Sequence, residues 1–182
     1  MERKNSINPM KNIRIEKVTL NIGAGKNQDV LEKGIKLVTS IAGIPPVKTF
    51  TNKRIPEWGL RPGLPIGCKL TLRGETAAKM LKRLVYAKDN TLKRSQFDDY
   101  GNIAFGIPEY IDIEGVKYEP DIGMMGLEVC ITLERPGFRI KKRKTRSQKI
   151  GKKHKITRED AVDFMKKEFG IKMFEELSGE EE

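Results

Sequence analysis

The sequence predicts an α+β fold, with a mainly antiparallel sheet that carries helices on one face and leaves its second, polar face open. Strict two-residue alternation over 66–73 and 127–134 is typical of strands that bury one face. Apolar residues three and four positions apart over 75–88 are typical of an amphipathic helix. Because such strands bury only one face, the helices are expected to cover that face.

Residues 13–22 form the first expected strand. Its alternation changes phase near Glu16–Lys17, which indicates a β-bulge or bend. A helix capped by Asn27 or Asp29 follows and runs to about Ala42, with its apolar residues on one side. A glycine and two consecutive prolines come just after it and end the helix.

A short strand over 47–51 leads into the loop 52–65. This loop has three prolines, two glycines and no apolar period. Loops of this length inside a domain are usually functional or disordered. The strand over 66–73 then points Cys68 and its large apolar neighbours inward, and the helix over 75–88 follows.

The next part of the chain is rich in Gly, Asp and Pro, and short strands are expected there over Asn102–Ile107 and Tyr110–Ile113. The strand over 127–134 comes next. The last helix begins at Thr157, with an acidic residue three positions on in a variant of the capping box, and ends at Gly170.

The 182 residues fit one domain, expected over 8–172. Its content of 37% apolar and 34% charged residues predicts a thin core, so some segments are expected to become ordered only against a partner. The domain includes the loop 52–65 and a basic arm, residues 135–156. An acidic, disordered tail is expected over 173–182.

The positive charge is concentrated in one segment. The chain has a net charge of +11, and twelve Lys or Arg but no Asp or Glu lie within 135–158. Such a run repels itself unless a polyanion neutralises it, so nucleic acid is the expected partner. A solvated charged face or a nuclear-localisation tract explains the segment less well. The candidate contacts of the basic arm are Arg139, Lys141, Lys142, Arg143, Lys144, Arg146, Lys149, Lys152, Lys153 and Lys155.

Membrane association is not expected. No apolar stretch reaches the roughly 20 residues that a bilayer span requires, and the basic segment has no regular apolar stripe. The first residues lack the apolar core of a signal peptide. Cys68 and Cys130 stand alone, which favours the reducing cytoplasm over a disulfide scaffold.

Two strands of the expected sheet supply polar side chains to its open face. Small polar groups beside well-spaced cations suit contacts with ribose and phosphate, so the open face is expected to bind RNA. The candidate contacts are Arg14, Thr19, Asn21, Lys69, Thr71 and Arg73.

The loop 52–65 is a second candidate for RNA contact. Lys53, Arg54 and Arg61 surround Trp58, an arrangement that suits a stacked base with neighbouring phosphates. The alternative is that Trp58 packs on the edge of the sheet and anchors the loop.

Catalysis finds little support in the sequence. The single histidine, His154, lies among lysines, and neither cysteine has a partner for redox or nucleophilic chemistry. The pairs Asp98-Asp99 and Asp112/Glu114 can hold Mg²⁺ in a nuclease, but such carboxylates more often form turns. The glycine-rich stretch 21–26 lacks the spacing of a nucleotide-binding loop. No catalytic residue, metal or cofactor is expected.

Several stretches of the chain resemble one family, the large-ribosomal-subunit proteins of the L-five family, which bind 5S ribosomal RNA. The resemblance covers about residues 8–172 and is most specific at PIGCKLTLRG. The similar stretches are VTLNIGAG (18–25), RPGLPIGCKLTLRG (61–74), FGIPEYIDIEGVKYEPDIGMMGLEVCITLERPGFRIKKRK (105–144) and KIGKKHKITREDAVDFMKKEFGI (149–171).

The resemblance implies a non-catalytic protein of the ribosome whose sheet face docks on 5S rRNA, here through Asn21, Gly23, Lys69, Thr71 and Arg73. It implies that the protein helps form the central protuberance with large-subunit rRNA and neighbouring proteins. It also implies that the loop before PIGCK, with Lys53, Arg54, Trp58 and Arg61, reaches the elbow of the P-site tRNA. The short N-terminal part and the basic insertion resemble the archaeal type, which is related to eukaryotic L-eleven.

The alternative function is that of a free RNA-binding factor, such as an RNA chaperone or a tRNA-binding module. Co-sedimentation with large subunits in high salt separates the two functions, because a free factor washes off.

Overall fold

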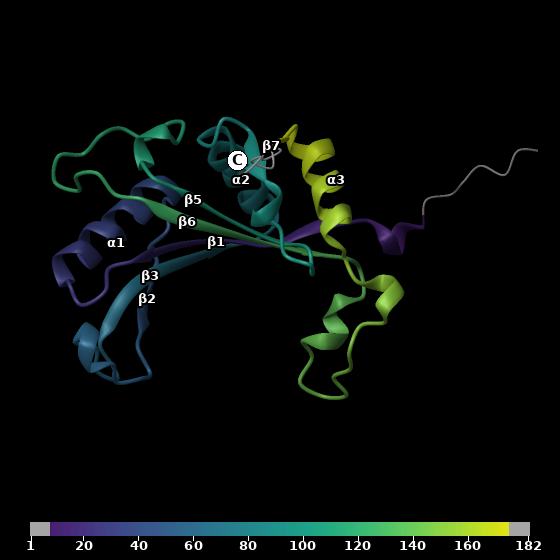
Figure 1. Ribbon diagram of the computed structural model, residues 1–182, viewed down its shortest axis with the longest axis horizontal. Coiled ribbons are helices and arrows are strands. Elements are labelled where there is room, and N and C mark those ends of the chain that lie inside the picture. The colour runs from purple at the N-terminus through teal and green to yellow at the C-terminus, as the bar shows by residue number, and fades with distance from the viewer. Residues whose placement is uncertain (1–7, 175–182) are drawn as a thin grey trace, which may run out of the picture.

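The computed structural model describes residues 8–174 and has the predicted α+β fold (Figure 1). Its centre is a five-stranded antiparallel sheet with the spatial order β2-β3-β1-β6-β5. The strands are β1 (Arg14–Gly23), β2 (Val47–Phe50), β3 (Pro65–Leu72), β5 (Asn102–Ile107) and β6 (Leu127–Glu134). One face of this sheet carries the helices (Figure 1). They are α1 (Gln28–Ala42), α2 (Gly74–Tyr86) and α3 (Arg158–Phe169).

β1 is the central strand of the sheet and pairs with β3 on one side and β6 on the other. Val18, Leu20 and Ile22 are buried, so the phase predicted for the second half of this strand is confirmed. The register against β6 shifts between Ile15 and Lys17, where two residues of β1 oppose one of β6. This is the predicted β-bulge, and it turns an extra side chain out of the regular alternation.

The helix boundaries follow the local signals. α1 starts after Asn27 and ends at Gly43, whose left-handed φ of 70° is the conformation that glycine adopts most readily. α3 starts after Thr157, which forms the predicted capping box with Asp160: the threonine hydroxyl accepts from the Asp160 N–H, and the carboxylate accepts from the Thr157 N–H.

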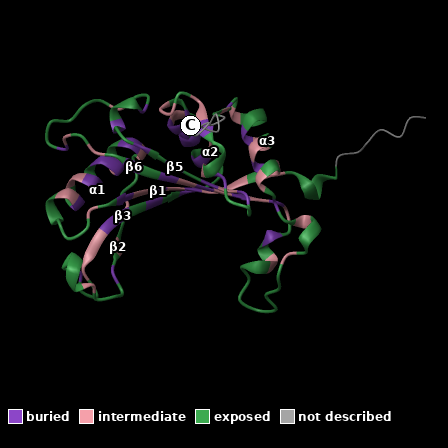
Figure 2. Cartoon of the chain, viewed as in Figure 1, coloured by how far each residue is buried: buried purple, intermediate pink, exposed green. Residues whose placement is uncertain are grey.

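One apolar core fills the space between the sheet and the helices. Most of the residues predicted to face inward from the strand 66–73 and the helix 75–88 lie in it, among them Leu70, Leu72, Leu81 and Leu84. Ile66, at the start of that strand, is only partly buried and lies outside this core. Burying a leucine side chain contributes about 1.5–3 kcal/mol, so this layer supplies much of the free energy of folding. Figure 2 shows the buried residues along the sheet and the inner sides of the helices, and exposed residues on the projecting segments.

The prediction of a short strand over Tyr110–Ile113 is wrong. Tyr110–Asp112 form a 3₁₀-helix, and Tyr110 is fully buried with its hydroxyl accepting a hydrogen bond from the Glu119 N–H at 3.0 Å. A stretch of four residues is too short for its apolar period to separate a strand from a turn of helix.

A second, two-stranded parallel sheet was not predicted. It pairs β4 (Thr91–Lys93) with β7 (Lys172–Phe174). The acidic tail was expected from residue 173, but the structure places Met173 and Phe174 in β7; residues 175–182 of that expected tail lie outside the described residues. Strands of three residues are too short to show an alternation in the sequence.

Two segments project from the open side of the main sheet (Figure 1). One is the loop 52–65 between β2 and β3, and the other is the basic arm, residues 135–156, between β6 and α3. We call the sheet with these two projections the arch. The 3₁₀-helices are η1 (Pro9–Lys11), η2 (Pro56–Trp58), η3 (Arg94–Gln96), η4 (Tyr110–Asp112), η5 (Phe138–Lys141) and η6 (Lys152–His154).

Candidate nucleic-acid interface

The middle of the open face is built from β3, β1 and β6. Thr19 pairs with Thr71, and Asn21 pairs with Lys69, so these four predicted residues lie side by side. Directly paired residues have Cβ atoms about 5 Å apart on the same face of a sheet. Glu128 of β6 is opposite Asn21 and accepts a hydrogen bond from its amide at 3.2 Å. This part of the face therefore combines hydroxyl, amide, ammonium and carboxylate groups.

Gly23 ends β1 beside Gly67 of β3. A Cβ atom at Gly67 would lie 2.5 Å from the carbonyl oxygen of Ile22, so only glycine allows the two strands this approach. A Cβ atom at Gly23 would meet no atom within 4 Å. Gly23 is exposed, and its backbone is accessible at the margin of the open face.

The predicted cations Arg14 and Arg73 lie at the other end of the open face, and each contacts a carboxylate. The Arg14 guanidinium lies 2.8 Å from the Glu134 carboxylate. Arg73 donates to the backbone oxygen of Glu16 at 3.4 Å, and its guanidinium lies 3.8 Å from the carboxylate of that residue. Sequence reasoning did not consider these carboxylates, although the outward alternation of the strand 127–134 already placed Glu134 on this face.

The loop 52–65 has its own internal contacts. Ile55 and Leu60 form two backbone hydrogen bonds with each other, at 3.1 and 3.0 Å, and Leu60 is buried. Thr51 is buried at the start of the loop and its hydroxyl donates to the Lys53 carbonyl. Trp58, in contrast, is 64% exposed. The alternative that Trp58 packs on the edge of the sheet and anchors the loop is therefore wrong, and Leu60 is the buried apolar residue of this loop.

The predicted cations of this loop are exposed, as the indole is. Lys53, Arg54 and Arg61 are exposed, and none of them has a carboxylate within 4.0 Å in the described part of the chain. An exposed aromatic ring can stack on a base, and exposed cations in the same loop can neutralise the neighbouring phosphates.

The basic arm is anchored at its base by buried groups. Arg135 donates to the Lys155 carbonyl at 2.8 Å and pairs with Asp160 at 3.1 Å, which joins the two ends of the arm to the start of α3. Phe138 and Ile156 are 5% and 2% exposed. The Arg135 and Arg158 cations, although part of the basic run, are thus structural: Arg158 pairs with Asp99 at 2.7 Å.

Beyond this base the arm presents its charge to solvent. Of the ten predicted contacts, Lys142 alone has a carboxylate partner within residues 8–174. Two of the others lie over aromatic rings, Lys141 over Phe138 at 5.1 Å and Lys155 over Tyr100 at 5.5 Å. The exposed cations without a carboxylate partner in that range are Arg139, Lys141, Arg143, Lys144, Arg146, Lys149, Lys152, Lys153 and Lys155.

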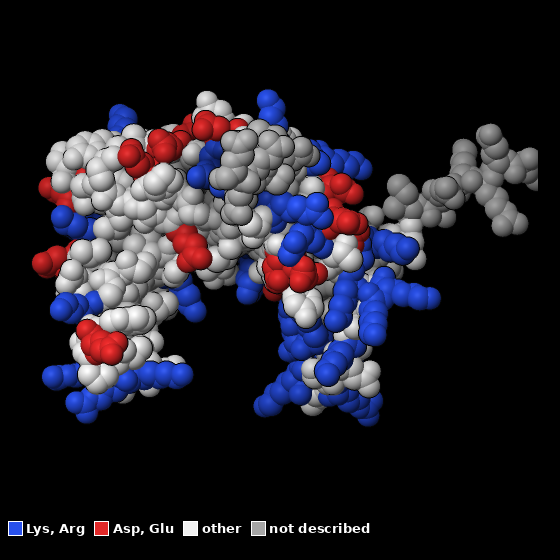
Figure 3. Space-filling model, in the orientation of Figure 1, with Lys and Arg blue, Asp and Glu red and all other residues white. Residues whose placement is uncertain are grey.

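The charges are arranged asymmetrically over the molecule. Figure 3 shows Lys and Arg side chains at the ends of both projections and acidic side chains along the opposite edge. The same view shows a hollow between the two projections, below the sheet. Cations on both sides of a concave surface focus a positive potential into it, which attracts a polyanion.

The groups capable of catalysis are not brought together. Burial raises the pKa of the Cys68 thiol; burial raises that of Cys130 too, with further contributions from the charge of Glu128 and a hydrogen bond to it. Both thiols are therefore poor nucleophiles. The His154 ring is hydrogen-bonded to the Pro136 carbonyl at 2.8 Å. Within residues 8–174 there is no group of carboxylates, histidines and cysteines that could hold a metal ion.

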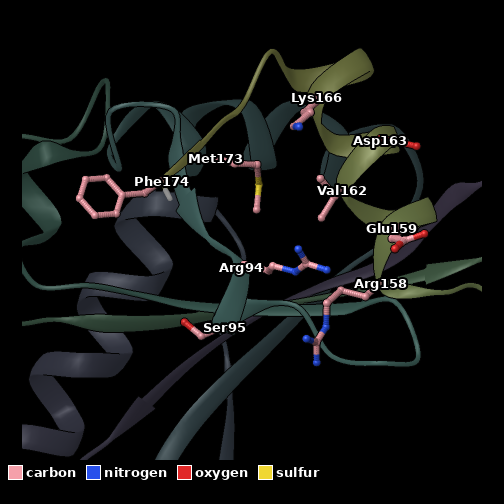
Figure 4. Close-up of a pocket in the computed structure, with 9 residues that line it drawn as sticks. All are labelled: Arg94, Ser95, Arg158, Glu159, Val162, Asp163, Lys166, Met173 and Phe174. Atoms are coloured by element: carbon pink, nitrogen blue, oxygen red, sulfur yellow. The ribbon is translucent and has the colours of Figure 1, made fainter. Parts of the chain in front are cut away.

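A cavity of about 610 Å³ lies between η3, α3 and β7, on the side of the molecule that carries the helices (Figure 4). The Arg94 guanidinium group points into it, together with Val162 and Met173, whereas the Arg158 side chain lines its lower edge and directs its guanidinium away from it. No nucleophile with a neighbouring base is among its described lining residues. None of the described helices is long and apolar enough to cross a membrane.

An open polar sheet face between two basic projections is typical of an RNA-binding protein. The comparisons with known proteins agree. A family model for ribosomal protein L5 matches residues 8–61, and a model for the C-terminus of the same ribosomal family matches residues 65–164. The chain belongs to the ribosomal protein L5 family.

Curated relatives named large ribosomal subunit protein uL5 match almost the whole chain. The protein from Nanoarchaeum equitans is 48% identical over 91% of this chain and 98% of its own length. That from Nitrosopumilus maritimus is 47% identical over 90% and 94%. That from Sulfurisphaera tokodaii is 42% identical over 96% and 99%. These relatives are archaeal, in agreement with the type expected from the sequence.

Membership in this family establishes several of the expectations. The family consists of structural ribosomal proteins, so this chain is a ribosomal protein and not an enzyme. It is an RNA-binding protein located in the cytoplasmic ribosome.

Proposed function

We propose that this protein is a structural constituent of the large ribosomal subunit that binds 5S rRNA in the hollow of the arch and helps form the central protuberance. One observation supports this most directly: the polar open face and both basic projections lie on the same side of the molecule. A folded RNA that enters the hollow can contact the open face and the arm at once, and the loop 52–65 stands at the opposite side of the hollow. The family membership supports a ribosomal RNA as that ligand and disfavours a free RNA-binding factor.

Each part of the arch has its own role in this proposal. The threonine, asparagine and lysine side chains in the middle of the open face contact ribose and phosphate, since hydroxyl and amide groups suit the 2′-OH of an A-form minor groove. Gly23 lets the RNA backbone approach the end of β1. The exposed cations of the arm neutralise phosphates of 5S rRNA and of the adjoining large-subunit rRNA.

The loop 52–65 contacts the elbow of the P-site tRNA in this proposal. It lies at the opposite side of the hollow from the arm (Figure 1), so it remains accessible to a second RNA while the arm holds the first. The exposure of Trp58 at 64% supports this role, because a tryptophan with no packing function is available to stack on a base.

The test is selective binding, measured with the purified chain and total ribosomal RNA. The wild type should retain 5S rRNA selectively. Lys69→Glu should weaken that binding at least tenfold, because it introduces a negative charge in the middle of the open face. Lys82→Glu is the matched control: it makes the same change on an exposed position of α2 and should leave the affinity nearly unchanged. Equal effects of the two variants would remove the open face from the binding site.

A further inference from the structure

Two carboxylates lie on the open side of the sheet, where the proposed ligand is a polyanion. Glu16 and Glu134 have side chains that are only 8% and 16% exposed. Carboxylates beside RNA phosphates oppose binding, and partial burial adds a desolvation cost. Because these two carboxylates near the base of the arm oppose RNA binding, we expect them to have a role that offsets this cost.

The backbone brings the two carboxylates together. Glu16 is the extra residue of the β-bulge in β1, between Ile15, which pairs with Leu133, and Lys17. The bulge takes Glu16 out of the regular alternation and places it near the end of β6. Glu134 is the last residue of β6, directly before the arm begins.

Lys142 of the arm binds both carboxylates. Its ammonium group lies 2.6 Å from Glu16 and 3.3 Å from Glu134. Arg14 and Arg73 approach the same carboxylates from β1 and from the end of β3, at 2.8 and 3.8 Å. Three cations thus surround two carboxylates, so the cluster carries a net positive charge.

This ion-pair cluster links the arm to the sheet at a second place. The base of the arm is held by Arg135, Phe138 and Ile156, on the side of α3. Lys142 adds a contact to the strands of the open face, which a single anchor at the base does not provide. The two carboxylates are largely shielded from water, whereas the Lys142 side chain is 40% exposed. A network of several charges contributes more than an isolated exposed ion pair.

We propose that Glu16 and Glu134 are positioning residues: through Lys142 they hold the basic arm at its angle to the open face before RNA arrives. This inference rests on the proposed function, since it concerns how the arm meets its RNA. A pre-ordered arm presents its other nine cations without the conformational entropy cost of ordering them at the moment of binding. The carboxylates thus strengthen the binding of a polyanion although their own charge repels it.

One double variant distinguishes the positioning role from a purely repulsive effect of the two carboxylates, because the two explanations predict opposite changes in RNA affinity. Glu16→Gln with Glu134→Gln removes two negative charges from the RNA side of the molecule, so charge alone predicts tighter binding. Positioning predicts weaker binding, by about tenfold, because the arm must be ordered on the RNA. Glu32→Gln is the control: this exposed carboxylate lies on α1, on the side of the sheet that carries the helices, and belongs neither to the open face nor to the arm. It should bind 5S rRNA as tightly as the wild type or slightly more tightly.

Limited trypsin digestion without RNA measures the arm directly. The Glu→Gln variants keep every tryptic site, and the double variant should be cut within residues 139–155 several-fold faster than the wild type and Glu32→Gln. A second pair, Lys142→Gln and Lys144→Gln, removes one arm charge and one tryptic site each. Only Lys142→Gln should speed cleavage, because Lys144 has no carboxylate partner in the described chain. Thermal unfolding of each variant checks that the core remains intact.

The outcomes distinguish the two proposals. Failure of the wild type to select 5S rRNA would refute the proposed function, while the digestion would still report on the arm. Selective binding by the wild type, together with equal or tighter binding by the double variant, would refute the positioning role. Unchanged cleavage of the arm in the double variant would do the same.

Discussion

At the scale of single residues, exposure decides which side chains are available to a ligand. Trp58 and Leu60 are both apolar and two positions apart, but Leu60 is 8% exposed and Trp58 is 64% exposed. Arg135 and Arg139 are both basic and four positions apart, but Arg135 is buried in an ion pair and Arg139 is free of one within the described chain. The residue type alone does not separate the structural member of each pair from the accessible one.

The prediction at this scale concerns Trp58→Ala. Ribosomes that carry the variant should release P-site tRNA several-fold faster, since one stacked base contributes about 1–3 kcal/mol. Folding should be little affected, because the indole buries little area. Phe50→Ala is the control, another exposed aromatic residue near the base of the same loop, at 57% exposure. Equal release rates with and without the tryptophan would show that the loop does not stack on tRNA.

At the scale of elements, one residue at the start of α3, Asp160, both caps the helix and binds the base of the arm. Asp160 accepts from Thr157 and pairs with Arg135, whose side chain is only 9% exposed. Burial acts to raise the pKa of Asp160, but the hydrogen bonds from Thr157 and the charge of Arg135 outweigh it, so the pKa lies below its ordinary value of 3.8. One carboxylate therefore stabilises both the helix and the arm.

Asp160→Asn should lower the free energy of unfolding by about 1–2 kcal/mol at pH 7, a value reduced from that of a fully buried pair because Asp160 is partly exposed. Because the folded pKa is lowered, the stabilisation by Asp160 is complete above pH 3.8 and is lost as the pH falls through the folded pKa. Urea denaturation between pH 7 and 2.5 should show the two proteins converging at acid pH. Asp163→Asn, on an exposed position of the same helix, should behave like the wild type throughout.

At the scale of the whole molecule, the fold places the basic run of the sequence along one side of the hollow, where it forms part of a single binding surface. Nine arm cations have no carboxylate partner within residues 8–174, and the loop 52–65 adds three more at the other side of the hollow. Binding through so many phosphates releases counterions, so its strength depends steeply on salt.

Replacing Lys141, Arg143 and Lys144 with Gln should weaken RNA binding and reduce the slope of log K against log salt by up to about 2–3, at roughly 0.7–0.9 per phosphate contact. Lys142 is left in place because its contacts are with carboxylates. The control replaces Lys36, Lys79 and Lys82, three exposed lysines of α1 and α2, and should leave the slope unchanged. Affinities at four salt concentrations are sufficient, and equal slopes in the wild type and the arm variant would contradict phosphate contact by the arm.

Much of the fold was predictable from local patterns. The strands over 66–73 and 127–134, the bulge near Glu16 and the cap at Thr157 each depend on a few neighbouring residues, and all are confirmed. The predictions failed in segments too short to show a periodic pattern of apolar residues. These are the 3₁₀-helix at Tyr110 and the three-residue strands of the second sheet.

The candidate site was predictable only in part. The alternation of the strands placed Thr19, Asn21, Lys69 and Thr71 on one face, and the register brings them side by side. The partners of the arginines were not foreseen, because Arg14 and Glu134 are 120 positions apart and meet only through the pairing of β1 with β6. The role of Glu16 likewise depends on a lysine from a distant segment.

Local patterns predicted the fold class and the excess of positive charge, because periodicity, capping and composition are local or additive properties, and the similar stretches indicated the family. The folded structure was needed to show which cations are free, which of them are held by carboxylates, and that the open face and both projections share one side of the molecule. These features depend on distances between segments that are far apart in the chain, and the register in which the strands pair sets those distances.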